Sequence, residues 1–302
     1  MGRVHGETMG TTWSATIVEP PQDAAREIEA VLAGVVGQMS HWEAASQLSR
    51  FNAAPVGGWH RIDPGFVQVM QTALDIASRS GGAFEPAIGG SVDLWGFGPP
   101  GPRDGLPTDD EVCAAHAASG HDALELDSLL LRLRRTRPAR LDLSGIAKGY
   151  AVDAVAARLR ALGCSDFLIE IGGELSGAGI QPDGQPWWVD VEIPPGLSMP
   201  PLRVALHGLA IATSGDYRRA AAQGSHTIDP RTGRPLTNHV ASVTVLHPSC
   251  MHADAWASAL TVLGPEPGME LATREGLAAH IAVRSERTAV EHLSPALHAM
   301  LD

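Results

Sequence analysis

The sequence contains few cysteines and no long apolar run. Its three cysteines, Cys113, Cys164 and Cys250, are scattered and form no CxxC pair, which excludes a disulfide framework and fits a reducing compartment or indifference to redox state. No run of about 18 apolar residues is present, so we expect no transmembrane helix. The N-terminal segment MGRVHGETMGTTW lacks the apolar stretch of a signal peptide. As the sequence stands we expect a cytoplasmic protein, or a periplasmic one if an export segment has been removed.

Lysine is also nearly absent. Lys148 is the only lysine among the 22 lysine and arginine residues, and the formal net charge is -12. Because nucleic acid is bound by clustered lysine and arginine, this balance argues against a nucleic-acid-binding protein. The one basic cluster, at 132–140, alternates with leucine and predicts an exposed strand edge. A hydrophobic content of 44% with 19% charged residues is typical of a globular protein.

A helix is expected at 65–80. Asp63 can serve as its N-cap, Pro64 suits the first helical position, and Gly81 can end it. The glycine and proline residues that follow at 85–107, including GFGPPGPRDG, predict an irregular loop.

Helices and strands follow one another elsewhere without a regular βαβ alternation. Apolar periodicity predicts further helices at 23–39, 146–162, 253–264 and around 269–276. Strands are predicted at 11–18, 122–126, 129–135, 141–143, 165–171, 186–193, 202–206, 209–213, 241–246 and 279–283, with 122–126 and 129–135 as a hairpin. This mixture favours an α+β fold with largely antiparallel sheets flanked by helices. Without repeats or a disordered linker, we expect residues 1–302 to form a single compact unit with two lobes.

The lone lysine lies in a segment that is typical of an anion-binding helix start. In LDLSGIAKGY we place Asp142 on a strand, Gly145 at a turn and Lys148 in the first turn of a helix. A helix N-terminus presents unpaired N–H groups and a partial positive charge, so the segment suits a phosphate. The P-loop spacing GxxxxGK[ST] is missing. An ordinary surface lysine explains the pattern equally well at this point.

Two further segments carry polar side chains that could do chemistry. At 212–238, two polar turn segments bracket a short helix, and His226 could act there as a base near neutral pH. The DPRTG motif in the same segment is also an ordinary turn. In HADAWASAL, Asp254 and Ser258 lie four residues apart and share a helix face, as two oxygen ligands of Mg²⁺ would. An aspartate near a helix start is also common without a metal.

Two other patterns do not predict sites. The histidine and cysteine residues at 113–121 and 247–252 lack the second ligand pair that a structural zinc site requires. The glycines at 172–179 follow a strand but lead into another strand instead of a helix. A dinucleotide-binding Rossmann turn is therefore disfavoured.

Taken together, these segments resemble the ApbE-like FAD:protein FMN transferases from Met9 to about Gly264. MGTTW is similar to the family's N-terminal MGT strand, and MSHWEAASQLSRFN is similar to its MSxYxxxSxLSxFN segment. GAFEPAIGGSVDLWGFG resembles the family's GAFDPTVGxLxxLWGFG loop, and LDLSGIAKGYAVD nearly reproduces the family signature. The IGG strand, ATSGDY, HTIDPRTG and ADAWASAL then follow in the family's order.

The resemblance implies an enzyme that transfers FMN from FAD to a Thr or Ser hydroxyl of a target flavoprotein through a phosphoester bond, with release of AMP. It implies that Asp254, Ser258 and the backbone carbonyl of Gly145 hold Mg²⁺. It implies contacts with FAD for Met9, Trp42, Ala83, Phe84, Glu85, Asp142, Lys148, His226 and Ile228. Within this scheme His226 is the candidate base.

Three positions depart from the family pattern. Ser258 replaces a usual Thr and loses a methyl group that stiffens the rotamer. Glu85 replaces a usual Asp, and Trp42 replaces a usual Tyr. The Ser258 and Glu85 changes keep open an FAD-binding protein without turnover. A second alternative is an FAD pyrophosphatase, in which water replaces the acceptor at the same site and FMN and AMP are the products. Many family members are exported lipoproteins, and no lipobox precedes the first motif of this sequence.

Overall fold

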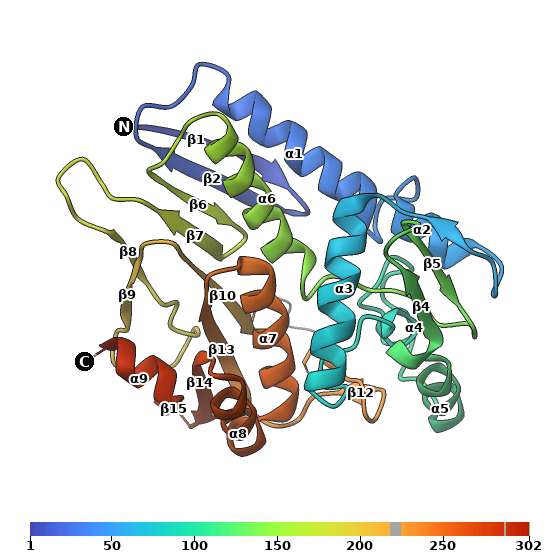
Figure 1. Cartoon of the computed structure of the whole chain (residues 1–302). Helices are drawn as coiled ribbons and strands as arrows, with labels where there is room; N and C mark the ends of the chain where they lie inside the picture. Colours follow the sequence, from blue (N-terminus) through green and yellow to red (C-terminus); the bar gives the residue numbers. More distant parts are fainter. Residues whose placement is uncertain (218–224, 287, 302) are drawn as a thin grey trace. The chain divides into compact units, whose positions relative to one another are not determined.

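The computed structural model describes residues 1–217, 225–286 and 288–301 (Figure 1). The chain divides into two compact units. The first unit comprises Met1–Gly34, Ile146–Tyr217 and His239–Asp302, and the second unit comprises Val35–Gly145 and Arg218–Asn238. Each unit is therefore assembled from segments that are far apart in the sequence. Among the described residues, no helix combines the length and the apolar character that a membrane crossing requires.

The first unit is built on an eight-stranded sheet in which neighbouring strands are antiparallel. The strand order is β1-β2-β6-β7-β10-β13-β14-β15. The strands are β1 (Gly2–Thr8), β2 (Thr11–Ile17), β6 (Phe167–Ile171), β7 (Glu174–Ala178), β10 (Leu209–Gly215), β13 (Val240–His247), β14 (Ala278–Ser285) and β15 (Thr288–Leu293). Strands β8 (Trp187–Asp190) and β9 (Arg203–Leu206) form a separate antiparallel pair. This architecture confirms the predicted α+β class.

Two helices that matter for the site lie side by side in the first unit, α6 (Ala147–Ala161) and α7 (Cys250–Leu263) (Figure 1). Helix α7 packs against β10 and β13 and is apolar around most of its circumference, which is why it is buried on almost every side. The other helices of this unit are α8 (Pro265–Glu275) and α9 (Pro295–Leu301). Helix α1 (Ala24–Met39) begins in the first unit and ends in the second.

The second unit combines helices with small antiparallel sheets. Its helices are α2 (Gln47–Ala53), α3 (Pro64–Arg79), α4 (Gly89–Leu94), α5 (Asp109–Ala118) and the 3₁₀ helix η1 (His121–Ala123). Its strands are β3 (His60–Arg61), β4 (Leu124–Asp127), β5 (Arg132–Arg135), β11 (Ile228–Asp229) and β12 (Arg234–Pro235). Helix α3 begins at Pro64 and ends before Gly81, as predicted, although the Asp63 side chain makes no capping hydrogen bond.

The predicted irregular loop at 85–107 is wrong in part, because it contains α4. The indole of Trp95, just after α4, is buried and donates a 2.7 Å hydrogen bond to the carbonyl of Gly233. A partner 138 residues away therefore holds this segment, and no local pattern reports it. The short helix predicted within 212–238 falls on 218–224, which lie outside the described residues.

The basic cluster at 132–140 does not form an exposed strand edge. Strand β5 is the middle strand of a sheet with the order β3-β5-β4. Arg132 and Arg134 form ion pairs of 2.9 Å and 2.6 Å with Asp127 and Glu125 of the neighbouring strand. The predicted hairpin is confirmed, and its acidic strand neutralises the basic one.

Candidate functional site

The start of α6 places the lone lysine beside a buried carboxylate. Lys148 lies in the first turn of α6, as predicted, and its Nζ is 2.5 Å from Oε1 of Glu174, the first residue of β7. The Glu174 side chain is 1% exposed, whereas that of Lys148 is 29% exposed. The ammonium group is thus held from within the protein and still reaches the surface.

Asp254 of α7 binds the first turn of α6. The N-cap residue Ile146 has no side chain that can accept a hydrogen bond, and the Gly149 N–H donates to Oδ2 of Asp254 at 3.0 Å. A Cβ atom at position 149 would lie 2.7 Å from the carbonyl carbon of Cys250 and 2.8 Å from Cβ of Asp254. Glycine is therefore the residue that lets the two helices approach closely enough for this bond.

Helix α6 binds the first turn of α7 in return. The carboxylate of Asp153 accepts hydrogen bonds from the Ser249 hydroxyl at 2.6 Å, from the Cys250 N–H at 2.9 Å and from the Met251 N–H at 3.0 Å. The two N–H groups are donors that a helix start leaves without intrahelical partners. Each of the two helices therefore has its N-terminus capped by a carboxylate from the other.

Asp254 and Ser258 lie one turn apart on α7, as predicted. Asp254 is 4% exposed, and this burial raises the pKa of its carboxyl, while the Lys148 ammonium and the Gly149 N–H act in the opposite direction. The Ser258 hydroxyl lies 3.4 Å from the hydroxyl of Ser214 on β10. A buried carboxylate with a hydroxyl one turn away is a pair of oxygen donors suited to a hard cation.

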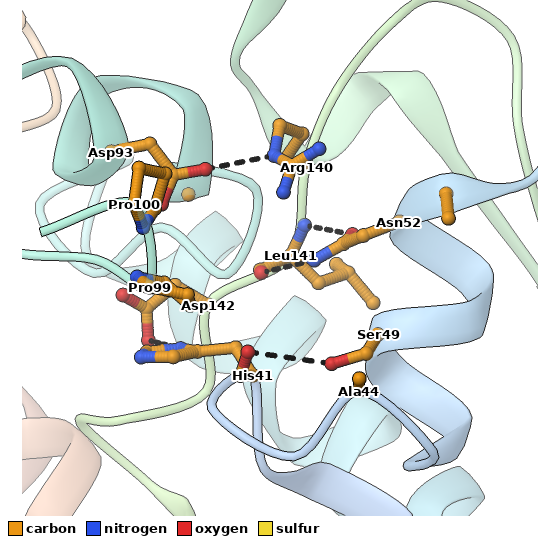
Figure 2. A pocket seen from close by; sticks show the side chains of 12 residues that line it. His41, Ala44, Ser49, Asn52, Asp93, Pro99, Pro100, Arg140, Leu141 and Asp142 are labelled. Carbon is orange, nitrogen blue, oxygen red and sulfur yellow. Dashed lines mark hydrogen bonds and ion pairs between the residues drawn. The ribbon is translucent and has the colours of Figure 1, made fainter.

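In the second unit, Asp142 is buried beside a histidine. Nδ1 of His41 lies 3.3 Å from Oδ1 of Asp142, and Figure 2 shows the two side chains directed at one another. Ser144 donates to the same oxygen through its N–H at 2.8 Å and its hydroxyl at 2.6 Å. Burial alone would raise the pKa of Asp142, but the hydrogen bonds from His41 and Ser144 outweigh it and hold the pKa below its ordinary value. The carboxyl group is therefore ionised at neutral pH.

The predicted strand at 141–143 is wrong, because only Arg140 forms a bridge, an isolated one with Ile88. Arg140 and Asp142 form main-chain hydrogen bonds with Gly89 and Pro86, whereas Leu141 between them is held by a side chain. Asn52 accepts a hydrogen bond from the Leu141 N–H at 2.8 Å and donates one to the Leu141 carbonyl at 2.9 Å (Figure 2). An amide that satisfies both main-chain groups replaces the neighbouring strand that the sequence pattern implied.

A cavity of about 400 Å³ adjoins Asp142 in the second unit (Figure 2). Residues of α2, α4 and the 140–142 segment contribute to its lining, and Asp93 and Arg140 face each other there at 3.0 Å. Burial raises the pKa of Asp93, and the Arg140 guanidinium counteracts it. The volume lies within the range of small-molecule sites.

Ala83, Phe84 and Glu85 are buried in the second unit. The Glu85 carboxylate accepts hydrogen bonds from the N–H groups of Ala87 at 2.8 Å and of His121 at 2.9 Å, and it lies 2.8 Å from Nδ1 of His121. The side-chain oxygens of Glu85 thus bind the protein itself. The extra methylene relative to Asp extends the reach of this carboxylate towards His121.

Met9 and Trp42 each have an unusual environment. Met9 and Gly10 form the two-residue turn between β1 and β2, with φ values of 50° and 72°. A positive φ is uncommon for a residue other than glycine and marks a locally constrained backbone. Trp42 is 56% exposed, and its ring centroid lies 5.3 Å from that of His41. An exposed tryptophan offers a large flat surface to a ligand.

His226 and Ile228 lie at the start of the 226–233 turn region. Ile228 begins β11 and packs its side chain into a hydrophobic cluster with Trp95. The carbonyl of Asp229 accepts a hydrogen bond from the Gly233 N–H at 2.8 Å, which confirms the predicted DPRTG turn. His226 is half-buried two residues before β11.

The structure brings some of the predicted residues together and adds others. Asp254 binds the N–H of Gly149, next to Lys148 at the start of α6, and the Lys148 ammonium favours its charged form. Three residues that the sequence did not single out contribute to the site. Glu174 pairs with Lys148, Asp153 caps the first turn of α7, and His41 lies against Asp142. Each is a common polar residue inside a longer motif, so its own position in the sequence gives little indication of a role in the site.

The comparisons with known proteins agree with one another. The ApbE family model matches residues 9–281. An FAD:protein FMN transferase of Vibrio cholerae is 37% identical over 299 residues, which cover 96% of this chain and 89% of the relative. The structure of a flavin transferase ApbE from Vibrio cholerae aligns with a TM-score of 0.92 at 36% identity and covers 99% of this chain and 98% of that one. The apo form of the flavinyl transferase ApbE of Pseudomonas stutzeri aligns with a TM-score of 0.90 at 37% identity, over 99% and 96% of the two chains.

Proposed function

Because the chain belongs to the ApbE family and is an FAD:protein FMN transferase, we propose that it is Mg²⁺-dependent and joins FMN to a Thr or Ser hydroxyl of a target flavoprotein. The observation that carries the proposal is the cluster at the start of α6. There an ammonium group at a helix N-terminus, Lys148, adjoins a buried carboxylate, Asp254. Such a cluster provides both a positive group for a pyrophosphate and a ligand for the cation that accompanies it.

We assign Mg²⁺ to Asp254 and Ser258 of α7, and to the carbonyl of Gly145 from the family resemblance. All three donors are oxygens, which Mg²⁺ prefers, and a single carboxylate is sufficient when substrate phosphates complete the shell. Among the described residues, no group of three or more His, Cys, Asp or Glu side chains could hold a metal ion. Asp254 fits the assignment because burial disfavours its charge until a cation compensates it. When bound, Mg²⁺ neutralises charge on the pyrophosphate.

We assign the FAD contacts by unit. In the first unit they are Met9 and Lys148. In the second unit they are Trp42, Ala83, Phe84, Glu85, Asp142, His226 and Ile228. Lys148 would donate to the pyrophosphate, and the exposed ring of Trp42 would stack on a planar ring of FAD. Glu85 and Ile228 would act through their main chains, because their side chains are engaged within the protein.

The transfer step follows from these roles. The acceptor hydroxyl oxygen forms a bond to the phosphorus of the FMN half, and the bond from that phosphorus to the bridging oxygen of the pyrophosphate breaks. AMP leaves with the bridging oxygen. His226 accepts the proton of the acceptor hydroxyl, and Lys148 stabilises the charge on the phosphoryl oxygens.

Incubation of the protein with FAD, Mg²⁺ and a flavoprotein acceptor domain tests the proposal by mass spectrometry. Transfer adds the mass of FMN, less water, to the acceptor and releases AMP. The matched controls are an acceptor with its Thr or Ser replaced by Ala, and the Asp254→Asn enzyme, which keeps the shape of the side chain but loses its charge. Free FMN without acceptor labelling would indicate a pyrophosphatase instead. Unchanged FAD would leave only a binding protein.

A further inference from the structure

Glu174 is a buried carboxylate to which the transfer step assigns no role. Its side chain is 1% exposed at the start of β7, a strand that is buried along most of its length. Removing a carboxylate from water costs several kcal/mol unless a partner compensates it. Lys148 is such a partner at 2.5 Å, so the lysine that we assign to the pyrophosphate also compensates the cost of burying Glu174.

The charges around Lys148 do not balance. Lys148 contributes one positive charge, and three carboxylates surround it, those of Glu174, Asp254 and Asp153, so the four groups sum to -2 when all are ionised. They act on common neighbours, because Asp254 binds the N–H of the residue next to Lys148 and the Cys250 thiol experiences the charges of all four groups. Whatever the charge of the other groups, Glu174 makes the cluster more negative by one charge. This carboxylate therefore strengthens the negative field that an incoming ion meets.

We propose that Glu174 sets the charge of this cluster so that the metal-free enzyme favours a divalent cation and disfavours the pyrophosphate of FAD. A net negative charge attracts the cation and repels the diphosphate. A bound divalent cation adds two positive charges and removes this repulsion. Glu174 thus favours entry of the metal before, or together with, FAD. The inference rests on the proposed role of Asp254 as a metal ligand.

The test measures two dissociation constants separately, that of FAD in EDTA by flavin fluorescence and that of Mn²⁺ without FAD by electron paramagnetic resonance. Both are measured at pH 8 in the wild type and in Glu174→Gln, whose amide keeps the size and an acceptor oxygen. We expect the FAD constant to fall and the Mn²⁺ constant to rise, each by at least about fivefold. Damage to the fold would weaken both ligands. Parallel changes, or no change in either constant, overturn the proposal.

Glu27→Gln is the matched control. Glu27 forms a 2.5 Å ion pair with Arg158 in the same unit, so its substitution removes the same charge from another pair. Both constants should remain within about twofold of the wild type. If Glu27→Gln reproduces the opposite shifts, net charge of the whole protein explains them, and the proposal fails.

If Glu174→Gln does not fold on its own, the same two constants are measured in the Lys148→Gln variant with and without Glu174→Gln. Lys148→Gln removes the positive charge of the cluster, and adding Glu174→Gln then removes one negative charge. Comparison of the double variant with Lys148→Gln must again show weaker Mn²⁺ and tighter FAD. The proposed metal site is tested independently by Asp254→Asn. If this variant binds Mn²⁺ like the wild type, the metal assignment fails whatever Glu174 does to FAD.

Discussion

The close approach of α6 and α7 depends on Gly149, and Gly149→Ala tests it. The added methyl group would lie 2.7 Å from the carbonyl carbon of Cys250 and 2.8 Å from Cβ of Asp254. Real Cβ atoms keep more than 3.0 Å from such neighbours. Because the obstacle is the backbone of α7, a side-chain rotation cannot relieve it, and the two helices have to separate.

Three contributions set the size of the effect on stability. Forcing a methyl group into a packed contact costs about 1–3 kcal/mol. Separation of the helices also lengthens the bond from the Gly149 N–H to the Asp254 carboxylate, and a hydrogen bond to a charged group is worth about 1.5–3 kcal/mol. Replacing a helical glycine by alanine returns about 0.5–1 kcal/mol. The free energy of unfolding should therefore fall by about 2–5 kcal/mol.

Urea unfolding with linear extrapolation measures this loss. Gly34→Ala is the matched control, since Gly34 lies inside α1 and a Cβ there would meet no atom within 4 Å. The control should be neutral or gain up to about 1 kcal/mol in the free energy of unfolding. If Gly149→Ala lies within about 0.5 kcal/mol of Gly34→Ala, the helices do not pack as described and the reasoning is refuted.

Three further substitutions test the assigned roles. Lys148→Arg keeps the charge but replaces a compact ammonium by a longer planar group, so FAD affinity should fall by about tenfold in a fluorescence titration; near-normal affinity would contradict the pyrophosphate contact. His226→Ala should retain FAD binding and transfer FMN roughly 10²-fold more slowly in single-turnover assays, and an unchanged rate would place the base elsewhere. Asp142 has its pKa held below the ordinary value by His41 and Ser144 despite burial, so its ionised form stabilises the fold above the unfolded pKa, and this contribution is lost as the pH falls below about 4. Asp142→Asn should therefore lower the free energy of unfolding at pH 7, and the loss should shrink as the pH falls below about 4, whereas a loss that does not change with pH would exclude the charge as its cause.

Elements with local signals could be predicted from the sequence. The helix expected at 146–162 is α6, Ala147–Ala161, and it ends before Gly163, whose φ is 87°. The helix expected at 65–80 begins at Pro64 for the reason that the sequence suggests. In both cases the residues that start or stop the helix are its immediate neighbours, so a short window of sequence contains the cause.

Features held by distant partners could not be predicted. Helix α4 ends just before Trp95, whose indole donates a hydrogen bond to the carbonyl of Gly233. No residue close to position 95 in the sequence indicates that contact. The strand expected at 141–143 depends on the same kind of partner, since the amide of Asn52 satisfies Leu141 in place of a strand.

The candidate site also has a part that the sequence predicts and a part that it does not. Its residue types could be predicted from the family resemblance, because each motif is contiguous in the sequence. The burial of Glu174 and its ion pair with Lys148 could not be predicted, since a sequence shows which residues are charged but not which of them are shielded from solvent.

The exchange of caps between α6 and α7 has a consequence for local opening. Asp153 of α6 holds the Cys250 and Met251 amides, and Asp254 of α7 holds the Gly149 amide. Both acceptors lie beyond the first turn of their own helix, so separation of the two helices releases both first turns at once, and we expect these turns to open as one cooperative unit. The amide hydrogens of both turns should then exchange with solvent at a common rate. The residues assigned to phosphate and metal would be lost together or kept together, and a half-assembled site would not persist.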